Sequence, residues 1–85
     1  MTMSGYLYLA ASGAPTTKVT VNTADQASAV FARYRKQYGL AASDLHERCG
    51  YVYATDGTLV AKISYNGRVW TPDGVLLQDP APAHR

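Results

Sequence analysis

The chain has 85 residues, of which 47% are hydrophobic and 16% are charged. This length fits one domain, and the balance excludes intrinsic disorder over most of the chain, because a disordered chain needs low hydrophobicity and high charge. No apolar run approaches the ~20 residues of a membrane span. A single cysteine excludes an internal disulfide, so the hydrophobic core must hold the fold alone.

Eight basic and six acidic residues give a formal net charge of +2, which is mild for a nucleic-acid binder. The one close basic group, Arg33, Arg35 and Lys36, is expected in the last turns of a helix, where the carbonyl end of the dipole stabilises positive charge. The apolar run 6–11 is short for the core of a signal peptide, and no basic residue precedes it. We therefore expect a cytoplasmic protein, in agreement with the free Cys49.

The first elements are predicted to be a β-hairpin followed by a helix. Segment 6–10 is apolar and aromatic, and segment 18–21 alternates polar and apolar residues, with Val19 and Val21 on the buried face. Thr23 and Gln26 form a capping box that begins the helix. The helix presents one apolar stripe that must be buried, and Ser28 is expected to face away from it. The stripe comprises Ala27, Val30, Phe31, Tyr34 and Tyr38.

Gly39 is expected to end the helix, because glycine tolerates the left-handed conformation after the last turn. Residues 40–49 are predicted to be a loop, and a β-meander follows. Three turn signals punctuate the meander, namely Asp56-Gly57, Asn66-Gly67 and Pro72-Asp73-Gly74. The expected strands are 51–55, 58–65 and 68–71, with 75–77 as an optional last strand.

The resulting order, ββαβββ, predicts an α+β domain of two layers, in which one helix covers one face of an antiparallel sheet of about five strands. The domain is expected to span residues 1–77. Residues 78–85, which include two prolines, are expected to form a flexible tail. The second face of the sheet has no helix to cover it, and we call it the open face.

The turn lengths decide which side chains the open face carries. A two-residue turn at Asn66-Gly67 pairs Ile63 with Trp70 and predicts that Trp70 lies in the core. A two-residue turn at Asp56-Gly57 leaves Tyr51 and Tyr53 on the open face. A three-residue turn with a glycine bulge sends both tyrosines to the core instead, and the sequence leaves this choice open.

The tyrosines of the open face are the candidate binding residues, because a contiguous apolar patch on a monomer marks a contact site. The alternative is that tyrosine simply suits strands and lies half exposed without a binding role. The candidate partner-binding residues are Tyr6, Tyr8, Tyr51, Tyr53, Lys62 and Arg68.

No specific catalytic motif is present. Asp44, His46, Glu47 and Cys49 form the one cluster of reactive side chains, which would suit a nucleophile with its base or part of a metal site. Their spacing matches no zinc pattern, and a solvated loop is the simpler interpretation. We therefore assign no catalytic, cofactor-binding or metal-binding residue, and we expect that the protein is not an enzyme.

The segment from Asp56 to Trp70, with the sequence DGTLVAKISYNGRVW, resembles the C-terminal hairpins of small accessory proteins carried by bacteriophages, plasmids and related mobile elements. That class includes anti-CRISPR proteins, which occupy a surface of a Cas protein or complex. The resemblance implies an inhibitor that binds another protein. Many anti-CRISPR proteins are acidic and imitate nucleic acid, whereas this chain is slightly basic, so a contact through aromatic surface is implied instead.

Three hypotheses follow from the sequence. The first is a small accessory protein that binds another protein, such as an anti-CRISPR inhibitor. The second is a single-stranded nucleic-acid binder, in which tyrosines stack on bases while Lys18, Lys62 and Arg68 contact phosphates. The third is a homodimer whose open faces pack together.

Overall fold

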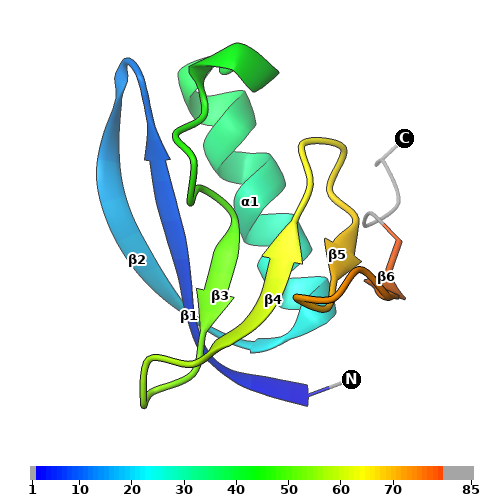
Figure 1. Ribbon diagram of the computed structural model, residues 1–85. Helices are drawn as coiled ribbons and strands as arrows, with labels where there is room; N and C mark the ends of the chain where they lie inside the picture. Colours follow the sequence, from blue (N-terminus) through cyan, green and yellow to red (C-terminus); the bar gives the residue numbers. More distant parts are fainter. Residues whose placement is uncertain (1, 80–85) are drawn as a thin grey trace.

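The computed structural model describes residues 2–79. Within this range one α-helix packs on a six-stranded antiparallel sheet, so the predicted α+β class is confirmed, with one strand more than the expected five (Figure 1). The element bounds are β1 Thr2–Ala11, β2 Ala14–Thr23, α1 Ala24–Tyr38, the 3₁₀ helix η1 Ala42–Asp44, β3 Tyr51–Tyr53, β4 Leu59–Ile63, β5 Val69–Trp70 and β6 Leu76–Gln78.

The strands lie in the order β2-β1-β3-β4-β5-β6, so the N-terminal hairpin joins the meander through β1. Leu7 of β1 stands opposite Val19 on one side and Val52 on the other. Leu7 and Val52 are fully buried, so β1 and β3 meet on the inner face of the sheet, in the core. The first hairpin closes tightly, because Ala11 already pairs with Ala14.

Helix α1 begins and ends where the sequence predicts. The Thr23 hydroxyl accepts a hydrogen bond of 3.0 Å from the Gln26 N–H, and the Gln26 side chain accepts one of 2.7 Å from the N–H of Asn22. The side chain therefore reaches one residue beyond the cap. Gly39 ends the helix with a left-handed φ of 63°.

We expect Thr23→Ala to lower the free energy of unfolding by about 1 kcal/mol, because a first-turn amide loses its acceptor. Thr23→Ser keeps the hydroxyl and should stay within a few tenths of a kcal/mol of the wild type. Urea unfolding followed by circular dichroism measures both. Equal losses in the two variants would show that the hydroxyl does not support the helix.

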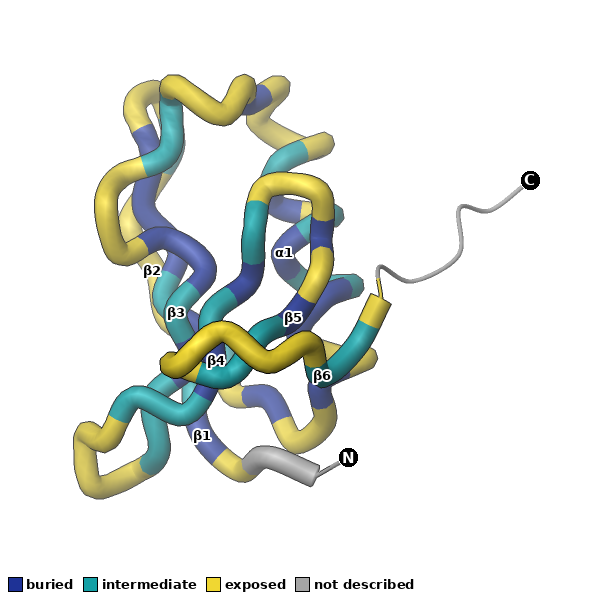
Figure 2. Tube along the Cα trace, turned by 45° about the vertical axis from the view of Figure 1, so that its right-hand side comes forward, coloured by how far each residue is buried: buried dark blue, intermediate teal, exposed yellow. Residues whose placement is uncertain are grey.

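The core lies between α1 and the inner face of the sheet, while the turns between strands are exposed (Figure 2). Tyr38, the last residue of the predicted stripe, is 37% exposed because it lies in the final turn of the helix. The expectation for Ser28 was wrong. It is buried, and its hydroxyl donates a 2.7 Å hydrogen bond to the carbonyl of Gly67, which ties the helix to the β4–β5 turn.

Trp70 does not lie in the core, contrary to the prediction. The β4–β5 turn has three residues rather than two, since Ser64 N–H donates to Arg68 O and Gly67, at a φ of 92°, donates back to Ser64 O. Pairing therefore slips by one residue, and Ile63 stands opposite Val69. Val69 fills the core position, and Trp70 lies half-buried on the open face opposite Lys62.

The β3–β4 turn also has three residues, with Ala54 N–H bonded to Thr58 O. By itself this turn would send Tyr51 and Tyr53 inward. A β-bulge in β4 cancels the slip, because Tyr53 pairs with Leu59 but its neighbour Val52 pairs with Ala61. Both tyrosines therefore remain on the open face.

Strand β6 forms in the segment that was predicted as an optional last strand. It includes Gln78, which pairs with Val69, so the sheet runs one residue into the range expected as a tail. Residues 80–85 of that tail lie outside the described part of the chain. Over residues 2–79, no helix has the length and hydrophobicity needed to cross a membrane.

Candidate binding face

A row of aromatic and basic side chains crosses the open face from strand to strand. In register, Tyr8 of β1 pairs with Tyr51 of β3, and Tyr51 pairs with Lys62 of β4. The row continues at both ends, to Lys18 of β2 beside Tyr8 and to Trp70 of β5 beside Lys62. Because cross-strand neighbours on one face stand about 5 Å apart, these five side chains form a continuous surface.

A second pair of rings lies next to this row. Tyr6 stands opposite Tyr53, and their ring centroids are 5.8 Å apart. Tyr53 also lies 6.3 Å from the ring of Tyr51. These separations are typical of favourable aromatic pairs. Tyr6, Tyr53 and Tyr51 are therefore packed against one another, and all four tyrosines remain half-buried rather than fully covered.

Three basic side chains lie over three of these rings. The Lys18 ammonium is 4.9 Å from the centre of the Tyr6 ring, and the Lys62 ammonium is 5.7 Å from that of Tyr51. The Arg48 guanidinium is 5.5 Å from the centre of the Tyr53 ring. Each is within the range of a cation–π contact, so the rings hold the positive charges in place above the sheet.

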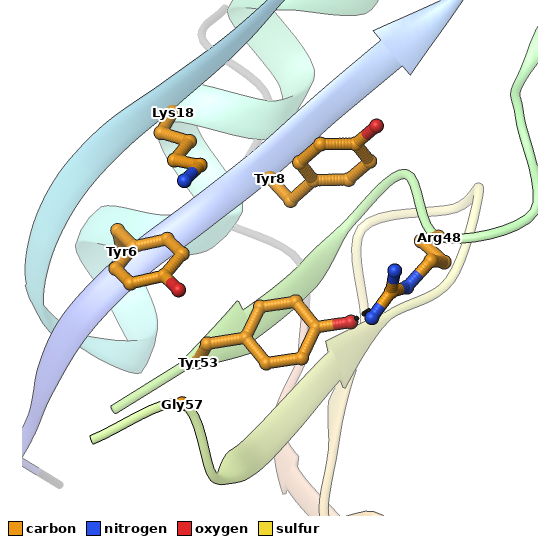
Figure 3. Close-up of a pocket in the computed structure, with 6 residues that line it drawn as sticks. All are labelled: Tyr6, Tyr8, Lys18, Arg48, Tyr53 and Gly57. Atoms are coloured by element: carbon orange, nitrogen blue, oxygen red, sulfur yellow. Dashed lines mark hydrogen bonds between the residues drawn. The ribbon is translucent and has the colours of Figure 1, made fainter. Parts of the chain in front are cut away.

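Arg48 is fixed by a further contact, because its Nε donates a 3.0 Å hydrogen bond to the Tyr53 hydroxyl (Figure 3). This hydrogen bond raises the pKa of Arg48 above its usual value. Figure 3 shows the residues that surround a shallow concavity of about 290 Å³ beside it. Its lining consists of Tyr6, Tyr8, Lys18, Arg48, Tyr53 and Gly57.

The positive charges on this face are not neutralised within the described chain. The ion pair found over residues 2–79 joins Arg68 to Asp79, at 3.6 Å, and it includes none of the three cations over the rings. Asp56 precedes Gly57, which lines the concavity. Its carboxylate accepts a hydrogen bond from the N–H of Thr58 in the same turn. This hydrogen bond lowers the pKa of the Asp56 carboxyl.

Five of the six predicted binding residues come together on the open face. The exception is Arg68, whose guanidinium contacts Asp79 instead of a tyrosine ring. Sequence reasoning did not assign Arg48 and Trp70 to this site, and it named Lys18 only as a phosphate contact in the nucleic-acid hypothesis. The alternation of polar and apolar residues around Val19 places Lys18 on the open face. Arg48 lies in a segment without periodicity, so no pattern indicates where its side chain points. The face on which Trp70 lies depends on the length of the β4–β5 turn.

The structure places the residues of the reactive cluster in the loop that leads from α1 to β3. Among residues 2–79, no three His, Cys, Asp or Glu side chains are placed to hold a metal ion. Cys49 is buried, and burial raises the pKa of its thiol. Asp44 accepts a hydrogen bond from the N–H of Ala41 and so serves to cap η1.

We expect Cys49 to react slowly with iodoacetamide at pH 8, because the raised pKa reduces the thiolate fraction and burial limits access. A matched control is Ser43→Cys in the Cys49→Ala background, since residue 43 is exposed in the same loop. Labelling followed by mass spectrometry should show the control reacting at least tenfold faster. Equal rates would contradict the burial of Cys49.

No family model matches the sequence of this chain, no curated protein is significantly similar, and no solved structure matches its fold.

Proposed function

We propose that this is a non-enzymatic binding protein that acts through a protein–protein contact made by the open face. The observation that carries the proposal is the cross-strand row of Lys18, Tyr8, Tyr51, Lys62 and Trp70. Aromatic side chains and arginine are the residue types in which interfaces concentrate their binding energy. A cytoplasmic location is part of this proposal.

The narrower proposal is an inhibitor of the phage or mobile-element type, such as an anti-CRISPR protein. It is supported by the resemblance of the segment 56–70 and by nothing in the geometry. The mild charge of +2 argues against imitation of nucleic acid, so the inhibitor would act by occupying a surface.

A single-stranded nucleic-acid binder is the second candidate, and the outward position of Trp70 favours it, because a half-exposed indole can stack on a base. The cation–π contacts argue against nucleic-acid binding, because the cations occupy ring faces on which bases would stack. The rings concerned are those of Tyr6, Tyr51 and Tyr53. A protein partner contacts ring edges and cations together, so it makes better use of this surface.

A homodimer formed by two open faces is disfavoured by charge. Packing the face on its own copy would place Lys18, Arg48 and Lys62 of both chains in one interface. Like charges juxtaposed in an interface cost several kcal/mol unless they are neutralised. We therefore expect the purified protein to be a monomer in sedimentation experiments.

Site-specific photo-crosslinking tests the proposal. A photoreactive phenylalanine analogue is placed at position 51, on the open face, and in a control at position 38, on the exposed end of the helix. In the cell that encodes the protein, we expect one partner to be captured from position 51 and not from position 38. Capture from position 38 alone, or from neither position, would contradict the proposal.

The captured partner is then purified and its affinity measured against variants. We expect Tyr51→Ala to weaken binding by about thirtyfold or more, which corresponds to about 2 kcal/mol for a central aromatic anchor. Tyr38→Ala is the matched control and should change the affinity less than twofold. If single alanine variants of Tyr6, Tyr8, Tyr51 and Tyr53 all unfold the domain, the tyrosines are core residues and no binding face exists.

A further inference from the structure

We propose that the concavity beside Arg48 is an anion subsite that receives a carboxylate of the partner protein, so that the partner surface is acidic. This inference rests on the proposed function and names the chemistry of the same face. Its basis is the placement of two cations, Lys18 and Arg48, in the wall of one concavity.

The two cations come from opposite sides of the concavity. Lys18 belongs to β2, and Arg48 belongs to the segment that leads into β3, so the strand β1 runs between them (Figure 3). Each side chain is exposed and lies over a tyrosine ring, Lys18 over Tyr6 and Arg48 over Tyr53. Because the rings attract the two charges to these positions, an incoming anion has less side-chain freedom to restrict.

The subsite has charge but no internal counter-charge. Within residues 2–79, neither Lys18 nor Arg48 forms an ion pair with a carboxylate, while the hydrogen bond to Tyr53 keeps one Arg48 donor engaged and leaves others free. A guanidinium presents five N–H donors, which match the two oxygens of a carboxylate. An anion in the concavity would therefore neutralise charges that the chain itself leaves unpaired.

A carboxylate on a protein fits this subsite better than a phosphate on a nucleic acid. The concavity of about 290 Å³ lies at the small end of ligand clefts and has room for a side chain rather than a nucleotide with its base. The face of the Tyr53 ring, on which a base would stack, is shared with Arg48. Lys62, over the Tyr51 ring, extends the positive surface beyond the concavity. This extended positive surface suits a run of acidic residues on the partner protein.

The probe for this subsite is a short peptide of alternating glutamate and valine, compared with its glutamine–valine counterpart. Binding is followed by NMR on the Arg48 Nε–H and on the backbone amides. We expect the glutamate peptide to shift Arg48 and residues 6–8, and the glutamine peptide to leave them unchanged. Lys18→Gln and Arg48→Gln should each weaken binding about fivefold, as the loss of an exposed ion pair predicts.

Lys36→Gln is the matched control, because it removes the same charge from an exposed position on the helix. Its effect should be less than twofold. An equal loss in the control would mean that only net charge matters and would overturn the subsite. Tighter binding of inorganic phosphate or of oligothymidylate than of the glutamate peptide would assign the concavity to phosphate and also overturn it.

The purified partner separates this inference from the proposed function. If Tyr51→Ala abolishes partner binding while Lys18→Gln and Arg48→Gln do not change it, the subsite is wrong and the binding face stands. If none of the three variants changes partner binding, both proposals fail. Thermal melts of the variants confirm that each is folded, as expected for exposed side chains such as Lys18 and Arg48.

Discussion

Gly50→Ala is expected to destabilise the domain by about 3 kcal/mol or more, the largest single effect that we predict on stability. Gly50 has a φ of 91°, which costs an alanine about 1–2 kcal/mol. A Cβ at this position would also lie 2.7 Å from the carbonyl oxygen of Ile63 and 3.2 Å from the Phe31 ring. Overpacking of this kind adds about 1–3 kcal/mol.

The position of Gly50 explains why this clash has no easy escape. Its N–H donates to Tyr8 O at 2.8 Å, and its carbonyl accepts the Ile63 N–H at 2.8 Å, so its backbone bridges β1 and β4. Moving it to make room for a methyl group would break one of these hydrogen bonds. A domain of this size has a total stability of roughly 4–13 kcal/mol, so the loss is a large fraction of it.

Gly74→Ala is the matched control, because Gly74 has a similar φ of 95° but a Cβ added there would meet nothing within 4 Å. It should cost only the conformational strain, about 1–2 kcal/mol. Urea unfolding measures both variants. If Gly50→Ala and Gly74→Ala cost the same, the close approach at Gly50 contributes nothing to stability.

Local signals allowed the two ends of the helix to be predicted. The Thr23 hydroxyl and the Gln26 side chain act within one turn, and Gly39 adopts the left-handed conformation that its lack of a Cβ permits. Such signals depend on residues three or four apart, so the sequence contains all the information that they need. The two-layer fold followed from the same kind of evidence.

The register of the meander depended on backbone details that residue types leave undetermined. Asp-Gly and Asn-Gly suit two-residue turns, yet both turns here have three residues and end on a glycine at positive φ. After Asn66-Gly67 the slip persists, and Trp70 moves to the open face. After Asp56-Gly57 the bulge in β4 cancels the one-residue slip in pairing. One residue of slip changes the face of every later side chain.

Arg48 could not have been assigned to the site from the sequence, because its place depends on contacts between distant segments. The loop that carries it is held to β1 by the hydrogen bond from His46 N–H to Ala10 O and to the hairpin end by a bridge between Ala11 and Leu45. The loop has neither apolar periodicity nor a turn motif. The path of the loop is therefore set by its contacts with the end of β1.

A ten-residue oligothymidylate is expected to bind this protein only weakly, with a Kd of about 0.1 mM or higher at physiological salt. Three cations can contact phosphates on the open face, namely Lys18, Arg48 and Lys62. For a single strand this gives a slope of log K against log salt of about −2, so affinity should fall about twentyfold from 50 to 200 mM salt. Titration monitored by Trp70 fluorescence measures both quantities.

Stacking of bases on aromatic rings would supply most of the affinity of a nucleic-acid binder, and the structure leaves few rings free for stacking. Base–aromatic stacking contributes about 1–3 kcal/mol per base, but Tyr6, Tyr51 and Tyr53 each have a cation over the ring. The Trp70 indole is half-buried, and its Nε1 donates a 3.2 Å hydrogen bond to Ser64 Oγ, so Trp70→Ala should change oligonucleotide affinity less than threefold. Because the chain has no other tryptophan, this variant is titrated by the anisotropy of a fluorescently labelled oligonucleotide. A micromolar Kd at physiological salt that Trp70→Ala weakens tenfold would establish stacking on the open face and replace the protein partner with a single strand.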